Sequence, residues 1–394
     1  MKILGINALN HDAAITLIED GKILFAAHAE RYSGIKNDSN LNKEMFEDME
    51  QYGEPDYVVY FENPYTKKLR QFMAGQYREV FSRKNLPQNH LDEVMGGKYS
   101  IDEYVDHHLS HASSTYFTSP YKESAVVCID AIGEFDTITI WYAKGNKLEK
   151  RYSQVYPHSL GLWYSAMTQR LDLKPQEDEF ILMGMAAWGR GSEELRQEMR
   201  DYFFKEGDDM KLKRNLHKGC LDWDSDFHPD DGTEEWKFDI AHNVQVICEE
   251  EIQKIFSKLP DLVPETTNVC YSGGVALNCV ANSLVVQDYP NLWILPNPGD
   301  AGSSLGCAAY VGGKHLDFME NGAFLGYDIK GEYPVKQVVK ELLKGNLVGV
   351  ANGRAEYGPR ALGNRSLLAD PRGKDIKAQM NTIKNRQEFR PFAP

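Results

Sequence analysis

The chain opens with short apolar runs separated by polar turns, a pattern that predicts β-strands joined as hairpins. A turn at residues 19–22 joins two of these runs, and a similar turn at 143–147 follows a later pair. The expected strands lie at residues 2–7, 13–18 and 23–27 in the first unit and at 124–129 and 137–142 in the second. The pattern therefore predicts two similar units, although many α/β proteins contain such a pattern.

Elsewhere apolar residues recur every three to four positions, which is the period of an amphipathic helix. The expected helices cover residues 40–51, 64–82, 159–169, 192–214, 241–259, 276–288, 301–310 and 335–343. Further short strands are expected at residues 268–271, 292–295 and 347–351. Residues 215–237 lack this period and are rich in Asp, His, Trp and Gly, so we expect a surface insertion or lid there.

Turn residues cluster at 322–333, which places a domain boundary there. The expected organisation is a first lobe at 1–150, a second lobe at 151–333 with an insertion at about 192–237, and a C-terminal segment at 334–394. The last segment, about 60 residues long, is marginal for an independent core. Either it needs a separate chain to complete it, or it is truncated, or it docks on the first lobe.

Composition and charge narrow the class of protein. The 394 residues are 42% hydrophobic, enough for sizeable cores. The net charge of −14 repels a polyanion at long range and argues against duplex nucleic acid as a stable partner, but not against a small phosphorylated substrate. Six scattered cysteines indicate reduced thiols. No run reaches the roughly 18 apolar residues of a membrane span, so a soluble, cytoplasmic protein is expected.

The most informative short motif pairs His107 with His111, four positions later. On a helix both imidazoles leave the same face, which makes them a ready pair of metal ligands. The residues between them do not include the Glu of a metalloprotease helix, so protease chemistry is disfavoured. The alternative is a solvated or capped helix end.

Two aspartates are candidates to complete a metal site. Asp130 follows the apolar strand at 124–129, and Asp300 precedes a helix of small residues. Two imidazoles with two carboxylates suit Fe²⁺, Mn²⁺ or Zn²⁺ and leave positions open for a substrate. The structural alternatives are a solvated turn for Asp130 and a helix N-cap for Asp300.

Two further segments are suited to binding a phosphorylated ligand. Residues 272–278 follow a strand and open a helix, and their glycines let the backbone approach a phosphate or ribose, unless this is only a tight turn. A cluster of basic residues, the basic island, stands out in this acidic chain. Guanidinium groups form bidentate hydrogen bonds with phosphate or carboxylate. Its members are Arg354, Arg360, Arg365, Lys384, Arg386 and Arg390. The alternative for this island is a solvated basic face.

In this order, five motifs make the whole chain resemble the O-carbamoyltransferases of nodulation-factor and antibiotic biosynthesis. They are His11-Asp12-Ala13-Ala14, His107-His108-Leu109-Ser110-His111-Ala112, Ser272-Gly273-Gly274-Val275-Ala276-Leu277-Asn278, Asn297-Pro298-Gly299-Asp300 and Glu356-Tyr357-Gly358-Pro359-Arg360-Ala361-Leu362-Gly363-Asn364-Arg365-Ser366. The resemblance implies an α/β protein with a duplicated ribonuclease-H-like fold of the actin and sugar-kinase type. This part is similar to the tRNA threonylcarbamoyl transferase. The start of a module similar to threonylcarbamoyl-adenylate synthases follows it.

The resemblance also implies a reaction. Carbamoyl phosphate and ATP, with Mg²⁺, give carbamoyl-adenylate, and the carbamoyl group then passes to an acceptor hydroxyl with release of AMP. The resemblance assigns a divalent metal, Fe²⁺ first with Mn²⁺ or Zn²⁺ as alternatives, to His107, His111, Asp130 and Asp300. It assigns the adenosine to Ser272, Gly273, Gly274, Val275 and Asn278.

His11 and Lys36 match positions beside the acceptor pocket. His11 is a candidate base for the acceptor hydroxyl or a structural histidine, and Lys36 orients an oxygen or is a solvated loop lysine. The acceptor is a small molecule with a hydroxyl group. Four aromatic residues either line its pocket or pack elsewhere: Tyr116, Phe117, Trp163 and Trp223.

The chain departs from the family in two places. Phe180-Ile181 stands where the family has a Gly-Lys pair, and family members continue beyond Pro394, which favours transfer from a supplied adenylate. Two alternative functions stay open. One is an ATP-dependent kinase or hydrolase of the same fold, disfavoured because such enzymes hold Mg²⁺ through carboxylates and phosphates. The other is a non-catalytic or partial subunit that needs a separate adenylating chain. A separate C-terminal module or a second copy of the chain is an expected partner.

Overall fold

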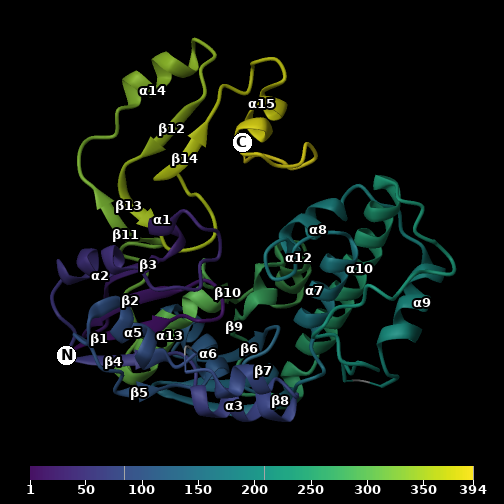
Figure 1. The fold of residues 1–394 in the computed structure, drawn as a ribbon, viewed down its shortest axis with the longest axis horizontal. Helices are drawn as coiled ribbons and strands as arrows, with labels where there is room; N and C mark the ends of the chain where they lie inside the picture. The colour runs from purple at the N-terminus through teal and green to yellow at the C-terminus, as the bar shows by residue number, and fades with distance from the viewer. Residues whose placement is uncertain (84, 208, 394) are drawn as a thin grey trace.

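The computed structural model describes residues 1–83, 85–207 and 209–393, and these form a mixed α/β protein around two five-stranded sheets (Figure 1). The first sheet has the order β3 (Lys22–His28), β2 (Ala14–Glu19), β1 (Lys2–Asn7), β4 (Tyr57–Tyr60) and β5 (Glu103–Tyr104). The second has the order β8 (Lys147–Val155), β7 (Asp136–Lys144), β6 (Glu123–Ile129), β9 (Val269–Ser272) and β10 (Leu292–Ile294). Both predicted hairpin units are therefore present.

The two sheets share one topology. In each, the first three strands of the unit pair antiparallel as a meander. The fourth strand then pairs parallel with the first, and the fifth pairs parallel with the fourth. The same strand order and the same strand directions recur, so the structure contains a duplicated unit, as the sequence predicted.

Two central helices pack on each other between the sheets: α6 (His107–Thr118) and α13 (Ser303–Gly312). Helix α13 packs on β1 and β2 of the first sheet, and α6 packs on β6 and β9 of the second. Small residues make this possible, since Gly306 brings the backbone of α13 against that of α6 at Ser110. The predicted close-packing helix at 301–310 is thus a central element of the fold.

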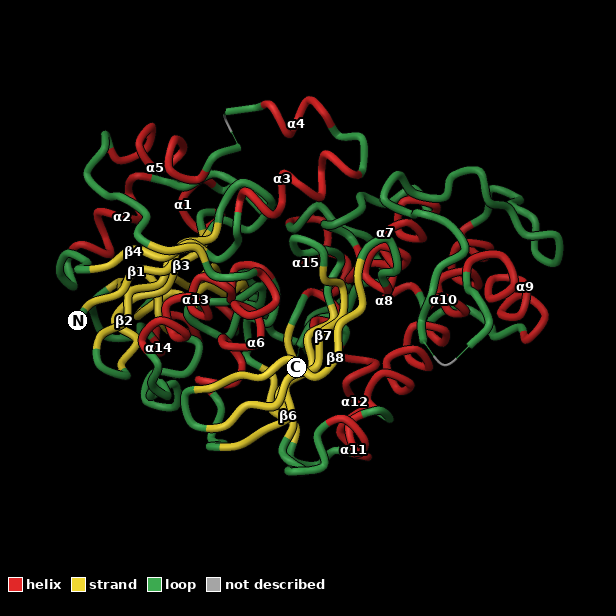
Figure 2. Tube along the Cα trace, turned by 90° about the horizontal axis from the view of Figure 1, so that it is seen from below, coloured by secondary structure: helices red, strands yellow, loops and turns green. Residues whose placement is uncertain are grey.

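The sequence of strand β6 contains a continuous apolar run, and its position in the fold explains why. Val126 and Cys128 point into the core around the first sheet and the central helices, whereas Val127 and Ile129 point into a second core. Both faces of the strand are buried, so both sets of alternating side chains are apolar. The second core is covered by α7 (Leu160–Arg170), α8 (Glu179–Met185), α9 (Glu193–Phe203), α10 (Glu234–Phe256) and α12 (Cys279–Asp288) (Figure 2).

The C-terminal segment forms two short hairpin-like pairs near the first lobe (Figure 1). Strand β11 (Phe324–Ile329) pairs with β13 (Gly353–Glu356) and also contacts β3, while β12 (Val348–Ala351) pairs with β14 (Arg365–Leu368). Helices α14 (Val335–Leu342) and α15 (Ile376–Ile383) complete the segment. The expected boundary at 322–333 therefore contains a strand. The division of the chain at residues 150 and 333 stays a prediction. The second sheet contains strands from both sides of residue 150, since β6 and β7 precede it and β9 and β10 follow it.

Several helix predictions need correction. The stretch 64–82 forms two helices, α3 (Pro64–Met73) and α4 (Tyr77–Phe81), because Gly75 between them has a left-handed φ of +74°. The helix expected at 192–214 is wrong beyond Phe203, where α9 ends. The expected insertion carries Trp223, which is buried in the second core, so this part of the segment packs against the second lobe. Within the described ranges, every helix is too short or too polar to cross a membrane.

Candidate metal centre

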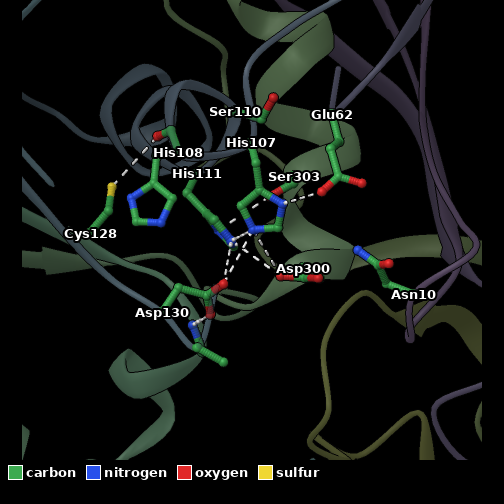
Figure 3. A network of polar contacts seen from close by, with 12 residues as sticks. Asn10, Glu62, His107, His108, Ser110, His111, Cys128, Asp130, Asp300 and Ser303 are labelled. Atoms are coloured by element: carbon green, nitrogen blue, oxygen red, sulfur yellow. Dashed lines mark hydrogen bonds and ion pairs between the residues drawn. The ribbon is translucent and has the colours of Figure 1, made fainter. Parts of the chain in front are cut away.

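The two histidines of the central motif lie at the start of α6, one turn apart and fully buried (Figure 3). Their Nε2 atoms are 3.0 Å apart and point toward the same place. The first turn is held by Glu134 from the loop after β6, whose carboxylate accepts the backbone N–H of His107 at 3.1 Å. Glu134, rather than the preceding residue Asp106, thus caps the helix that presents both imidazoles.

Two buried carboxylates converge on these imidazoles. The Asp130 Oδ2 atom lies 3.2 Å from His107 Nε2, and the Asp300 Oδ1 atom lies 3.2 Å from His111 Nε2. One donor atom from each of the four residues lies within 4.8 Å of all the others. The structure therefore brings together all four sequence-predicted metal ligands. The two structural alternatives are wrong, since both carboxylates are buried in this cluster rather than solvated or capping a helix.

The donor set fits a divalent transition metal. Two imidazole nitrogens and two carboxylate oxygens are the ligands such ions prefer, and separations of 3.0–3.9 Å suit neighbouring ligands with bonds of about 2.0–2.2 Å. The outer atoms are anchored as well. Asp130 Oδ1 accepts the Gly274 N–H at 2.8 Å, and His111 Nδ1 lies 3.2 Å from Ser303 Oγ. Such outer contacts fix the orientation of metal ligands.

The pKa shifts of the clustered residues indicate that the two buried carboxylates favour a positive charge beside them. Burial acts to raise the pKa of the Asp300 carboxyl, but the facing His11 and His107 hold it well below its usual range. Conversely, burial acts to lower the pKa of His107, but Asp300 and Asp130 raise it well above its ordinary value. A cation, whether an imidazolium or a metal ion, is the natural counter-charge for two buried carboxylates.

His108, inside the same motif, has a different role. Its Nδ1 lies 2.9 Å from Thr139 Oγ1, and its ring is directed away from the ligand cluster (Figure 3). Burial lowers its pKa to about 3, so the ring stays neutral. It is a packed core histidine.

His11 stands beside the cluster. Its Nε2 lies 3.5 Å from Asp300 Oδ2, its Nδ1 lies 2.9 Å from Asp12 Oδ2, and 33% of its side chain is exposed. Partial burial acts to lower its pKa, but Asp300 and Asp12 outweigh this and raise the pKa to about 9. The two neighbouring carboxylates therefore favour the protonated form of His11.

A cavity of about 630 Å³ opens from the cluster. Residues predicted to bind the metal, the nucleotide and the acceptor meet in its wall, although they come from distant parts of the chain. They are His11, Lys36, Asp130, Gly274, Val275, Asn278, Asp300, Arg360, Lys384, Arg386 and Arg390. The C-terminal tail thus borders the same space as the candidate metal centre, and there Arg390 lies over the Phe180 ring of the second lobe rather than on the first lobe.

Lys36 reaches across the cavity to the second lobe. Its Nζ donates to the Glu177 backbone oxygen at 2.6 Å and lies 4.5 Å from the centre of the Phe180 ring. Arg390 from the tail lies at the same 4.5 Å from that ring. Phe180 therefore lies between two cations in the cavity wall.

Four predicted binding residues lie outside the described lining of the cavity. The Arg354 guanidinium donates to the Leu24 backbone oxygen at 2.7 Å, and Arg365 donates to that of Tyr327 at 2.9 Å, so both brace the C-terminal segment. Ser272 is the last residue of β9, and Gly273 joins it to the glycine turn, which is formed by residues 274–278. A Cβ at Gly273 would come within 2.3 Å of the Ile129 oxygen, so this glycine permits close packing.

The sequence reasoning missed part of the wall. The four aromatic candidates are buried in the two cores, and the aromatic rings that line the cavity are Tyr164 and Phe180. His28 also lines it, with its Nε2 2.8 Å from Asn297 Nδ2. Its place at the end of the third strand, beside the His11 motif, is the signal that could have identified it.

Comparison with known proteins agrees with the motifs. The sequence model described as "Carbamoyltransferase N-terminus" matches residues 62–309, and that described as "Carbamoyltransferase C-terminus" matches residues 339–394. Among solved structures, T. kodakarensis HypF aligns at 15% identity and a TM-score of 0.44, over 81% of this chain and 48% of that one.

Three relatives illustrate the sequence similarity. An uncharacterized protein of Synechocystis is 33% identical, over 100% of this chain and 75% of the relative. Nodulation protein NolNO of Sinorhizobium fredii is 26% identical, over 98% of this chain and 62% of the relative. The 3'-hydroxymethylcephem-O-carbamoyltransferase of Streptomyces clavuligerus is 31% identical, over 41% of this chain and 36% of the relative. The family predicted from the motifs is confirmed, and the chain belongs to the carbamoyltransferase family.

Proposed function

We propose that this protein is an O-carbamoyltransferase that moves a carbamoyl group from carbamoyl-adenylate to the hydroxyl of a small-molecule acceptor. The observation that carries the proposal is that the buried His107, His111, Asp130 and Asp300 cluster opens onto the same cavity as the glycine turn and the basic tail. Family membership and the duplicated sheets support it. We assign those sheets to the ribonuclease-H-like, actin and sugar-kinase type, in which a nucleotide lies between the lobes.

The four clustered residues are the proposed ligands of a divalent ion, Fe²⁺ first with Mn²⁺ or Zn²⁺ as alternatives. When bound, such an ion supplies Lewis-acid polarisation of the carbonyl or phosphoryl oxygen. The chain's own contribution is to hold two imidazoles and two carboxylates buried and fixed by outer contacts.

The adenylate is proposed to lie against the glycine turn, where backbone N–H groups at the start of a helix favour an anion. Gly274, Val275 and Asn278 supply this wall, and the tail residues Arg360 and Arg390 face the same space with positive charge. ATP, carbamoyl phosphate and Mg²⁺ are the proposed precursors of the adenylate. Whether the C-terminal segment or a separate chain makes the adenylate is decided by the experiment below.

The acceptor hydroxyl attacks the carbamoyl carbon, a new C–O bond forms, and the bond to the AMP phosphate oxygen breaks. His11 is the proposed base for the hydroxyl proton, because its ring is partly exposed and lines the cavity beside Asp300. It acts as a base in its neutral form. Lys36, which also lines the cavity, is proposed to orient an oxygen of the bound group.

The test supplies the protein with Mn²⁺ or Fe²⁺, a panel of hydroxyl acceptors, and either carbon-labelled carbamoyl phosphate with ATP or synthetic carbamoyl-adenylate. Labelled carbamoylated product with release of AMP supports transfer. Pyrophosphate release without acceptor indicates that this chain also makes the adenylate. Formation of ADP and phosphate alone favours the kinase or hydrolase alternative, and no turnover from either donor with no metal bound favours a non-catalytic subunit.

A pair of histidine variants sharpens this test. His111→Ala removes one proposed ligand and is expected to abolish transfer. His217→Ala removes a histidine that contacts Gln76 and lies outside the described cavity lining, and this variant is expected to keep full activity. Equal activity in the two variants would refute the assignment of the site.

A further inference from the structure

One residue of the C-terminal segment lies inside the core of the first lobe. Tyr357, which follows β13, is 1% exposed and packs among the side chains of the first sheet and α13. Its backbone N–H donates to the Ala323 oxygen at 2.6 Å, and the next carbonyl, that of Gly358, accepts from Arg31 at 3.0 Å. The backbone is therefore held on both sides of this ring, by Ala323 before β11 and by Arg31 of the first lobe.

The phenol contacts the backbone immediately after a proposed metal ligand. Its hydroxyl donates to the Ala301 oxygen at 2.6 Å and lies 2.9 Å from Ser304 Oγ. Ala301 directly follows Asp300, and Ser304 directly follows Ser303, which contacts His111. Burial raises the pKa of Tyr357 to about 12, so the hydroxyl keeps the proton that it donates.

The same ring also contacts the other end of the loop that carries Asp300. The Tyr357 ring meets the His28 ring edge to face, with 5.2 Å between centres. His28 in turn lies 2.8 Å from the side-chain nitrogen of Asn297, where the loop begins. Tyr357 thus acts on residues 297–301 at both ends, directly at Ala301 and through His28 at Asn297.

We propose that Tyr357 is a positioning residue, through which the C-terminal segment fixes the 297–301 loop and thereby aims the Asp300 carboxylate at His107 and His111. The inference rests on the proposed metal centre. Its physical basis is that the buried Ala301 carbonyl accepts from two hydroxyl groups, Tyr357 at 2.6 Å and Ser304 at 2.9 Å, and the phenol is the one that ties it to the C-terminal segment. The C-terminal segment is thus part of the centre's support, even though all four ligands come from the two lobes.

The test compares Tyr357→Phe, which keeps the ring and removes the hydroxyl, with Tyr289→Phe. The Tyr289 phenol also donates to a backbone oxygen, that of Phe256 at 2.7 Å, but it lies outside the cavity wall. Mn²⁺ is titrated into the metal-free full chain, and amide exchange is followed by mass spectrometry in a peptide spanning residues 297–305. We expect Tyr357→Phe to bind Mn²⁺ about 10- to 100-fold more weakly and to exchange faster in that peptide. Tyr289→Phe is expected to match wild type in both.

Unchanged Mn²⁺ affinity in a folded Tyr357→Phe protein would overturn the inference, and so would a wild-type chain that binds no Mn²⁺. Weaker binding with unchanged exchange in the loop would also overturn it, because the effect would then act elsewhere. Neither measurement involves carbamoyl transfer. Weakened Mn²⁺ binding in a protein without transfer activity would therefore refute the proposed function alone, whereas intact transfer with unaltered binding would refute this inference alone.

Discussion

Replacing Gly306 with alanine tests how the metal centre depends on the packing of the two central helices. A Cβ at this position would lie 1.8 Å from the Ser110 backbone oxygen and 2.7 Å from its carbonyl carbon. Raising the first distance to 3.0 Å, below which Cβ contacts are essentially not seen, requires the helices to separate by about 1.2 Å. Because the obstacle is backbone, a change of side-chain rotamer brings no relief.

The expected cost follows from this displacement. Overpacking a core typically costs about 1–3 kcal/mol, and a clash with backbone belongs at the upper end of that range. Ser110 directly precedes His111, and Asp300 lies at the start of α13, so the same separation lengthens the 3.2 Å distance between their donor atoms. Metal sites tolerate about 0.2 Å in ligand distance, so we expect metal affinity to fall about 100-fold or more.

Urea unfolding and Mn²⁺ titration measure the two effects. With a slope of about 3 kcal/mol per molar urea, a loss of about 3 kcal/mol lowers the midpoint by about 1 M. Gly312→Ala is the matched control in the same helix, since its Cβ would meet only the Ile18 and Ile3 methyl ends, at 3.2 and 3.5 Å. It is expected to stay within about 1 kcal/mol of wild type, helped by the better helix propensity of alanine. A Gly306→Ala protein with the wild-type midpoint and Mn²⁺ affinity would refute this reasoning.

Three further predictions concern other contacts. Glu134→Ala leaves the buried His107 N–H without its acceptor and is expected to cost about 1–3 kcal/mol in urea unfolding, with Glu134→Gln costing less. Burial lowers the pKa of His90, whose Nε2 accepts the Leu41 N–H at 3.0 Å, so the folded state binds fewer protons than the unfolded state. The free energy of unfolding is therefore unaffected by His90 above about pH 6.5 and falls as the pH drops below this value, because the unfolded state then takes up the proton. His90→Gln should flatten the profile of urea midpoint against pH below about pH 6.5, and an unchanged profile would contradict this. Arg390→Ala should raise KM for carbamoyl-adenylate about tenfold with little change in kcat, and a change in kcat alone would contradict a binding role.

The strands that could be predicted are those whose burial leaves a mark in the local pattern. Strand β6 is apolar from Ala125 to Ile129 because both of its faces are covered, and β2 and β3 are separated by an obvious turn. Strand β8 was not predicted as a strand, since it is an edge strand with mostly exposed, charged residues and is held by its backbone pairing with β7. Four-residue β4 is too short to stand out from its surroundings.

The proposed ligand cluster was accessible from sequence because His107, His111 and Asp300 belong to recognisable motifs and Asp130 ends an apolar strand. The role of Arg354 and Arg365 could not be predicted, because the sequence does not distinguish an arginine that donates to backbone carbonyls from one that binds phosphate. The contact between Tyr357 and Ala301 joins residues 56 positions apart. Such a contact follows from the tertiary arrangement alone, so the sequence revealed the motif around Tyr357 but not its use.

The position of the centre follows from how the helices begin. Helix α6 starts at His107, α13 starts just after Asp300, and the turn that leads into α12 donates its Gly274 N–H to Asp130. The positive ends of these helices therefore surround two buried carboxylates and help to keep them ionised. The two buried carboxylates place negative charge at this point, whereas the basic residues Arg360, Lys384, Arg386 and Arg390 bring positive charge to the lining of the same cavity. The cavity therefore offers negative charge to the proposed metal ion and positive charge to the proposed adenylate, and we expect Gly306→Ala to disturb the first of these.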